Sequence, residues 1–208
     1  VASGQEKFVA KEIWGAEADA VWTGAEHIWL KQENTVPAFI QFRDGLEPDE
    51  ETFFFLLRKA FHLPPSYNFN LLNDEFDQIG WQHKRFQITV NDIPVTNGIF
   101  ILHLKNGLVK KFNGYLFKNV LAATSATVSE SSALQFALTD IGAQKYKWQL
   151  PEEESYLKIE TGDVNATYFP KGNLEILQLG KNDATDFKLA WKFDIYAHEP
   201  MSRNYVYV

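Results

Sequence analysis

The stretch GWQHKRFQITVNDIPVTNGIFILHLKNGLVKKFNGYLF, residues 80–117, decides the fold of the first half of this chain. Polar and apolar side chains alternate over 85–90, which is the period-2 pattern of a half-buried strand. Two more apolar runs, 99–104 and 108–117, flank Asn106-Gly107. A type I′ turn needs φ > 0 at both central residues, and Asn-Gly meets that requirement. The stretch therefore predicts three linked antiparallel strands.

The residues before this stretch predict a helix packed on further strands. Residues 13–22 have roughly helical apolar spacing, and 36–42 and 67–72 are predicted strands. Between those strands, Asp49 is a predicted N-cap, and the helix that it starts runs to about Phe61. This helix has an apolar stripe at i, i+3, i+4 and i+7, which predicts one core-facing side: Phe53, Leu56, Leu57 and Ala60.

The second half repeats this outline with its helix first. Residues 118–128 are small and polar and are interpreted as a connection, after which Ser129 caps a helix that ends at Gly142. Glu152 to Glu154 are assigned to a solvated turn. Strands are predicted over 156–160, 166–169, 174–179 and 187–197, and another begins at 205. The sequence thus predicts an α+β fold of two helix-on-antiparallel-sheet lobes, residues 1–120 and 121–208.

Composition narrows the functional classes. The net charge of −7 argues against a nucleic-acid partner, because phosphate binding needs a basic face. The chain has no cysteine, so disulfides and thiol chemistry are excluded. No apolar run approaches the roughly 18 residues that a membrane span needs. Because the chain neither starts like a natural protein nor ends at an element boundary, we expect it to be a piece of a longer polypeptide.

Catalytic motifs are missing from the sequence. A zinc peptidase of the common helical type needs His-Glu-x-x-His, but the single His-Glu, His198-Glu199, has Ser202 at the second histidine position. His83 and His103 could face each other across the predicted sheet and bind a metal, although a hydrogen-bonded structural pair is more common. We therefore expect a non-catalytic chain without a metal or cofactor of its own.

The central stretch resembles the propeptide motif of the fungalysin and thermolysin families, which are secreted zinc metallopeptidases made as zymogens. The resemblance rests on an ordered set of residues rather than on any one string. The set is Gly80, His83, Arg85, Phe86, Gln87, Ile93-Pro94-Val95, Gly98, His103, Asn106-Gly107 and Asn113-Gly114. The second half resembles the PepSY-like domain that follows this motif in the same peptidases, and 191–196 with 205–208 is similar to its closing hairpin.

These resemblances imply a cystatin/PepSY-like pro-region that helps a catalytic domain to fold and holds it inactive until cleavage. They imply that the partner is the cognate zinc metallopeptidase domain, that zinc belongs to that domain, and that the protein is secreted. The candidate motif or partner-contact residues are His83, Arg85, Gln87, Pro94, His103, Asn113 and Gly114. The alternative is a free-standing cystatin-like inhibitor or binding module unrelated to a zymogen, because fold does not fix function.

Overall fold

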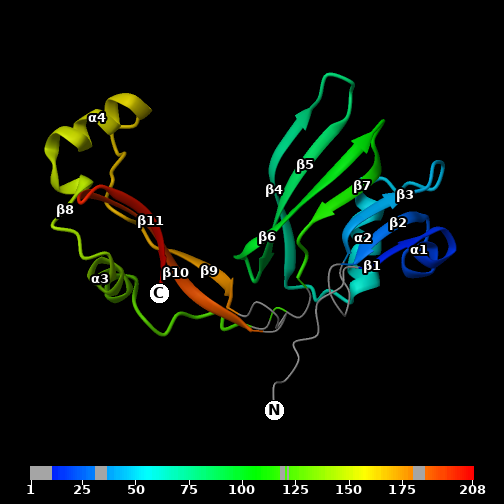
Figure 1. Ribbon diagram of the computed structural model, residues 1–208, viewed down its shortest axis with the longest axis horizontal. Coiled ribbons are helices and arrows are strands. Elements are labelled where there is room, and N and C mark those ends of the chain that lie inside the picture. The colour runs from blue at the N-terminus through cyan, green and yellow to red at the C-terminus, as the bar shows by residue number, and fades with distance from the viewer. Residues whose placement is uncertain (1–10, 31–36, 118–119, 121, 180–185) are drawn as a thin grey trace, which may run out of the picture. The chain divides into compact units, whose positions relative to one another are not determined.

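The computed structural model describes residues 11–30, 37–117, 120, 122–179 and 186–208. The chain divides into two compact units, the first within Val1–Leu121 and the second formed by Ala122–Leu179 and Asp186–Val208 (Figure 1). Four α-helices and antiparallel strands make up the described residues, which confirms the predicted α+β class.

The first unit is built on a seven-stranded antiparallel sheet in the order β1-β2-β3-β7-β6-β5-β4. Its helices are α1, Gly15–Val21, and α2, Glu50–Phe61. Its strands are β1 (Lys11–Trp14), β2 (Ala25–Leu30), β3 (Pro37–Phe42), β4 (Tyr67–Phe76), β5 (Gln82–Val90), β6 (Ile93–Lys105) and β7 (Leu108–Gly114). The element predicted over 13–22 is therefore a short strand followed by a short helix.

Helix α2 packs an aromatic core against this sheet. Asp49 caps the helix as predicted, because its side chain accepts a hydrogen bond from the Thr52 N–H at 2.7 Å. Phe53 is fully buried and stacks on Trp22 and on Phe112. The buried stripe is Phe53, Leu57 and Phe61. Ala60 is exposed, so its predicted core position is wrong: the stripe runs at i, i+4 and i+8 and leaves Ala60 on the margin.

The predicted hairpin turn between β6 and β7 is confirmed. Asn106 and Gly107 have φ of 53° and 78°, which is the left-handed conformation that the two central residues of a type I′ turn require. The turn pairs Lys105 with Leu108 and Leu104 with Val109. A bulge then shifts the register by one residue, so that His103 lies opposite Lys111 and Ile101 lies opposite Asn113. The three central strands of the sequence prediction are therefore present as β5, β6 and β7.

The second unit is a smaller sheet with one core helix. Strand β10 (Phe187–Glu199) pairs along its length with β9 (Asn173–Gln178), β11 (Ser202–Tyr207) and the short β8 (Lys145–Tyr146). Helix α3 (Glu130–Ile141) begins at the Ser129 cap and ends at Gly142, as predicted. Their shared core contains Ala133, Leu134, Ala137, Tyr146, Phe193, Ile195 and Ala197.

Two strand predictions in this unit are wrong. Residues 156–160 belong to helix α4, Pro151–Thr161, which follows a short 3-10 turn, Lys147–Gln149, and 166–169 forms no strand. Pro151 occupies the first turn, where its missing N–H has no cost, and three glutamates there favour the positive end of the helix dipole. The glutamates assigned to a turn are thus the start of α4. No residue of α4 is buried, so the helix lacks the apolar stripe that would have marked it.

Candidate partner-binding site

The candidate residues gather on the face of the first sheet that points away from α2, called here the outer face. Side chains alternate along β5: Lys84 contacts Glu50 of α2 and Phe86 contacts Phe54, so His83 and Arg85 point to the opposite side. Strand pairing places the outer-face residues in two cross-strand rows. One row is Trp14, His27, Gln41, Lys111, His103, His83 and Glu75, and the next is Trp29, Phe39, Asn113, Ile101, Arg85 and Asn73.

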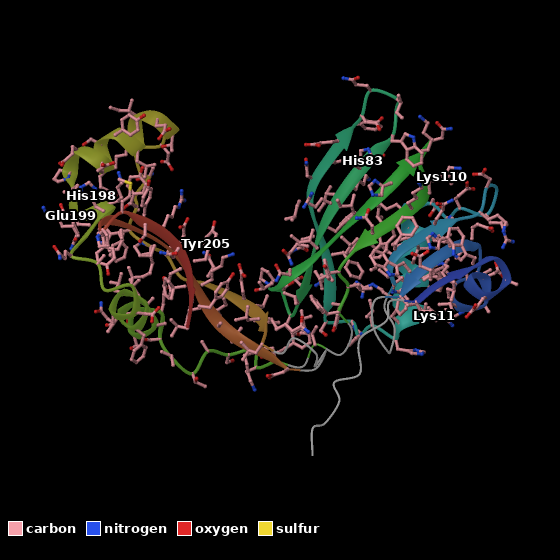
Figure 2. All side chains as sticks on the ribbon, viewed as in Figure 1. Lys11, His83, Lys110, His198, Glu199 and Tyr205 are labelled. Carbon is pink, nitrogen blue, oxygen red and sulfur yellow. The ribbon has the colours of Figure 1, made fainter. Side chains whose placement is uncertain are left out.

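A hydrogen-bonded chain of four side chains crosses the outer face. His83 Nδ1 lies 2.7 Å from His103 Nδ1, and His83 Nε2 lies 3.4 Å from Asp77 Oδ2. On the other side, His103 Nε2 is hydrogen-bonded to Asn113 Oδ1. His83 projects from β5 (Figure 2), and its register partner on β6 is His103. The structure therefore brings together three of the predicted residues and adds Asp77.

Asp77 holds the end of this chain in place from the β4–β5 turn. Its Oδ1 accepts hydrogen bonds from the backbone N–H groups of Trp81 at 2.8 Å and Ile79 at 3.0 Å. The Trp81 hydrogen bond, with smaller contributions from His83 and Ile79, holds the pKa of the Asp77 carboxyl below its usual value despite partial desolvation. Asp77 is thus a charged acceptor beside His83 across the neutral pH range.

Burial disfavours the charged form of His103. Desolvation lowers the pKa of His103 most, the hydrogen bond to Asn113 partly offsets this, and the nearby charges of His83 and Lys111 lower the pKa further. The net effect is a pKa below the usual histidine value. The cationic form of His103 is therefore disfavoured in the folded chain.

Gln87 has a structural role at the start of β6. Its side-chain Nε2 donates to the carbonyl oxygens of Val95 at 2.8 Å and of Gly98 and Ile88 at 3.0 Å. Pairing between β5 and β6 is interrupted here, since Gln87 pairs with Ile99 while Thr89 pairs with Pro94. The amide thus satisfies carbonyl groups that the strand ladder leaves open. Pro94 lies at this interruption, where a residue without an N–H is tolerated.

Gly114 allows β7 to approach β6 closely. Its φ is 145°, and a Cβ there would lie 2.4 Å from Phe100 Cα and 2.5 Å from the Ile99 carbonyl oxygen. Any other residue would overlap with the backbone of β6. In the Asn113-Gly114 pair of the motif, Asn113 is therefore the hydrogen-bond partner of His103, and Gly114 occupies a position that only glycine can take.

Arg85 differs from the other candidates because its side chain is exposed and has no ion pair within the described residues. Its neighbours across the strands are Asn73 and Ile101. An exposed guanidinium without an ion pair, beside the half-buried Ile101, is typical of protein interfaces, where arginine is enriched. Of the seven candidates, Arg85 is the one that is exposed rather than partly buried.

The His83–His103 pair does not fit a zinc site. A structural zinc site takes four ligands and a catalytic site three, whereas the two facing nitrogens here have no third donor aimed between them. Across the described residues, no group of three or more His, Cys, Asp or Glu side chains is placed to hold a metal ion. Likewise, no described helix combines the length and apolarity of a membrane span.

Comparison with known families identifies this region. Residues 67–116, which run from β4 through β7, match the Fungalysin/Thermolysin Propeptide Motif. The chain therefore carries the propeptide motif of these peptidase families, and the resemblance drawn from the central stretch is confirmed. The match covers the strands that hold the histidine chain, Gln87 and Gly114.

A particular relative extends the similarity beyond the motif. Over 150 residues the chain is 29% identical to Bacillolysin from Bacillus amyloliquefaciens, a match that covers 71% of this chain and 26% of the relative. The chain thus spans about a quarter of the length of that protein.

The sequence analysis did not identify two residues of the outer face, Asp77 and His27. Asp77 joins the chain through a turn, and His27 joins its row through strand order; the Asp-x-x-Gly spacing before β5 was the available signal for Asp77.

Proposed function

We propose that the chain is the pro-region of a secreted zinc metallopeptidase zymogen, which assists folding of the catalytic domain and keeps it inactive before cleavage. The observation that carries the proposal is the propeptide motif over residues 67–116. The two units would be cystatin/PepSY-like lobes divided near residues 120 and 121. The catalytic zinc would belong to the peptidase domain, which is the cognate partner.

The physical basis of both activities is a single contact. A partner that binds the native catalytic domain, but not its unfolded chain, stabilises the native state by mass action. Covalent linkage within one precursor raises the effective concentration of that contact to about the millimolar range for a short linker. The same contact could block the active-site cleft, for example through an added strand from an exposed sheet edge or from residues after β11. If inhibition persists after the residues that follow β11 are deleted, those residues are not the added strand.

The outer face offers the contact residue for this proposal. Arg85 is exposed and carries a charge that no described carboxylate pairs with, so a partner could bind it without disrupting the fold. Lys59 is the matched control, because it is an exposed cation in the last turn of α2, away from the outer face. Arg85→Ala should weaken binding to the catalytic domain about tenfold, whereas Lys59→Ala should leave binding within about twofold.

Refolding tests the folding activity directly. The catalytic domain of the same precursor would be denatured, then diluted with or without this chain, and assayed for peptide hydrolysis after high dilution releases inhibition. We expect a several-fold higher recovered activity with the chain than with an unrelated acidic protein. Equal recovery would contradict the folding role. The reading frame beyond Val208 provides a simple check: a downstream His-Glu-x-x-His supports the zymogen, and a stop codon supports a free-standing module.

A further inference from the structure

The facing histidines place a limit on how many protons this site can hold. Asp77 Oδ2 is a carboxylate oxygen and only accepts, so the proton between it and His83 sits on His83 Nε2. His83 Nδ1 is then a lone-pair acceptor when His83 is neutral. The 2.7 Å separation of the two Nδ1 atoms requires one proton between them, which a neutral pair takes from His103 Nδ1.

The orientation of the Asn113 amide then follows the charge of the pair. If His103 uses its only proton at Nδ1, its Nε2 must accept from the Asn113 amide nitrogen. If His103 keeps its proton at Nε2, that nitrogen donates to Asn113 Oδ1, and His83 must then be the imidazolium that supplies the proton between the two Nδ1 atoms. Both arrangements keep every donor matched to an acceptor. The chain Asp77–His83–His103–Asn113 therefore accommodates either no positive charge or one.

A second charge breaks the arrangement. If both rings are imidazolium, both Nδ1 atoms carry protons and face each other at 2.7 Å, which is a donor–donor clash between like charges. We propose that His83 and His103 form a one-proton site that acts as an acid switch: uptake of a second proton forces β5 and β6 apart at this pair and loosens the first unit.

The surroundings of the pair support one charge but not two. Asp77 faces His83 from the β4–β5 turn, and Glu75 is the register partner of His83 on β4. Lys111 is the register partner of His103 on β7, and Arg85 and Lys105 follow along β5 and β6 on the same face. Lys111 and Lys105 therefore lie beside His103 and Arg85 lies beside His83 on the same strand, whereas the acidic groups lie at the far end beyond His83. Burial, which lowers the pKa of His103, acts in the same direction.

The sign of the pH effect follows from linkage. Below the usual histidine range, the unfolded chain carries protons on both imidazoles, but the folded pair carries one. Because the unfolded state binds more protons, stability falls as the pH falls, by up to about tenfold in the folding equilibrium per pH unit for one proton. For the peptidase, and resting on the proposed function, the consequence would be weaker inhibition at acidic pH.

Histidine NMR of the whole chain tests the switch without any peptidase. The ring carbon-bound protons and the ring nitrogens of His83 and His103 would be followed from pH 8 to pH 4. We expect two steps separated by about one pH unit or more, with Nδ1 of the pair sharing a single proton until the second step. Two histidines that titrate independently, or a second proton taken up with no loss of the β5–β6 amide signals, would overturn the proposal.

Two variants test the same point through stability. Gln at position 103 can donate to His83 Nδ1 but cannot take a second proton, so His103→Gln should reduce the fall in unfolding free energy between pH 7 and 5. His62→Asn is the control, since His62 is exposed in the left-handed conformation that Asn tolerates, and it should leave the fall unchanged. An undiminished fall in His103→Gln would contradict the switch.

The second variant, Asn113→Asp, fixes an acceptor opposite His103 Nε2. Its carboxylate should therefore move the first proton uptake of the pair to higher pH. No upward movement in the NMR titration would contradict the assigned hydrogen bonds. The chain could show the expected two-step titration and yet neither assist folding of the catalytic domain nor inhibit it. That outcome would support the switch and reject only the proposed function.

Discussion

The two sheets of this chain use polar residues in different ways on the face opposite the core helix of each unit. The outer face of the first sheet holds a hydrogen-bonded chain centred on two histidines beside the charged side chains of Lys111 and Arg85. Three of the five histidines of the chain lie in one of its rows. The corresponding strands of the second unit, β10 and β11, hold permanent charges in a ladder that also includes tyrosines. There Arg203 pairs with Asp194 at 2.7 Å and Lys192 pairs with Glu175 at 2.9 Å.

Aromatic rings cover these ion pairs in the second unit. Lys192 Nζ lies 4.6 Å from the ring centre of Tyr205, which projects from β11 (Figure 2), and Arg203 lies 5.4 Å from that of Tyr196. Hydrogen bonding and the charge of Asp194 raise the pKa of Arg203. Burial alone lowers the pKa of Lys192, but Glu175 outweighs it and the net direction is upward. Groups whose pKa is raised lose their stabilising effect only in alkali, so Lys192 and Arg203 should not make the second unit sensitive to mild acid.

The largest expected effect on stability comes from a substitution at Gly114, where β7 approaches the backbone of β6 most closely. Gly114→Ala should destabilise the chain by about 3 kcal/mol or more, because the new Cβ overlaps with the β6 backbone at a φ that L-residues rarely adopt. Gly162→Ala in the second unit, where φ is 67° and no atom lies within 4 Å, should cost only about 1–2 kcal/mol. Denaturant unfolding measures both, and equal losses would contradict the assigned close approach.

Gln87→Ala should have the next largest effect. Three carbonyl oxygens lose their shared donor, and we expect a loss of about 1–3 kcal/mol in unfolding free energy. The matched control is Gln135→Ala on an exposed position of α3, which should change stability by less than about 0.5 kcal/mol. If the two variants unfold alike, Gln87 is a contact residue rather than a support for β6.

Hydrogen exchange at different pH values sharpens the contrast between the units. After correction for intrinsic exchange, amides of β5, β6 and β7 should lose protection between pH 7 and pH 5, by up to about tenfold per pH unit. Amides of β10 and β11 should keep theirs, because the raised pKa values of their cations affect stability only at high pH. Parallel losses in both units would show that acid acts on the chain generally.

The smallest expected loss of stability comes from breaking the Arg203–Asp194 ion pair between β10 and β11. Arg203→Met removes an ion pair whose arginine is largely exposed, so it should cost less than about 1 kcal/mol, and the loss should shrink with added salt. Thermal unfolding at low and high ionic strength measures this difference. A loss comparable to that of Gln87→Ala would mean that the ladder stabilises the second unit as strongly as hydrogen bonds stabilise the first.

Local chemistry predicted the parts of the fold that short segments determine. The Asn106-Gly107 turn and the Asp49 and Ser129 caps depend on neighbouring residues alone, and all three are confirmed. Helix α4 was predicted as a strand because none of its side chains is buried, so its apolar residues carry no helical stripe. Pro151 and the glutamates after it were the signal that was interpreted as a turn.

The site was predictable only in part, for the same reason. The expectation that His83 and His103 could face each other agrees with the structure. Their exact register could not be inferred from the turn, because the β5–β6 pairing shifts between Gln87 and Thr89. Their end partners were not inferred, because Asp77 reaches His83 from a turn. His27 lies in the same row as His83 and His103 only because β2, β3 and β7 pair over long sequence separations, which no local pattern specifies.

Titration of the purified chain into the mature catalytic domain of its precursor, at neutral pH, is the most direct test of the account. Peptide hydrolysis would be followed as the chain is added. The pro-region assignment predicts saturable inhibition at micromolar affinity or tighter, weakened by Arg85→Ala and unaffected by Lys59→Ala. Hydrolysis that stays constant up to high chain concentration would contradict the inhibitory role and favour a free-standing binding module.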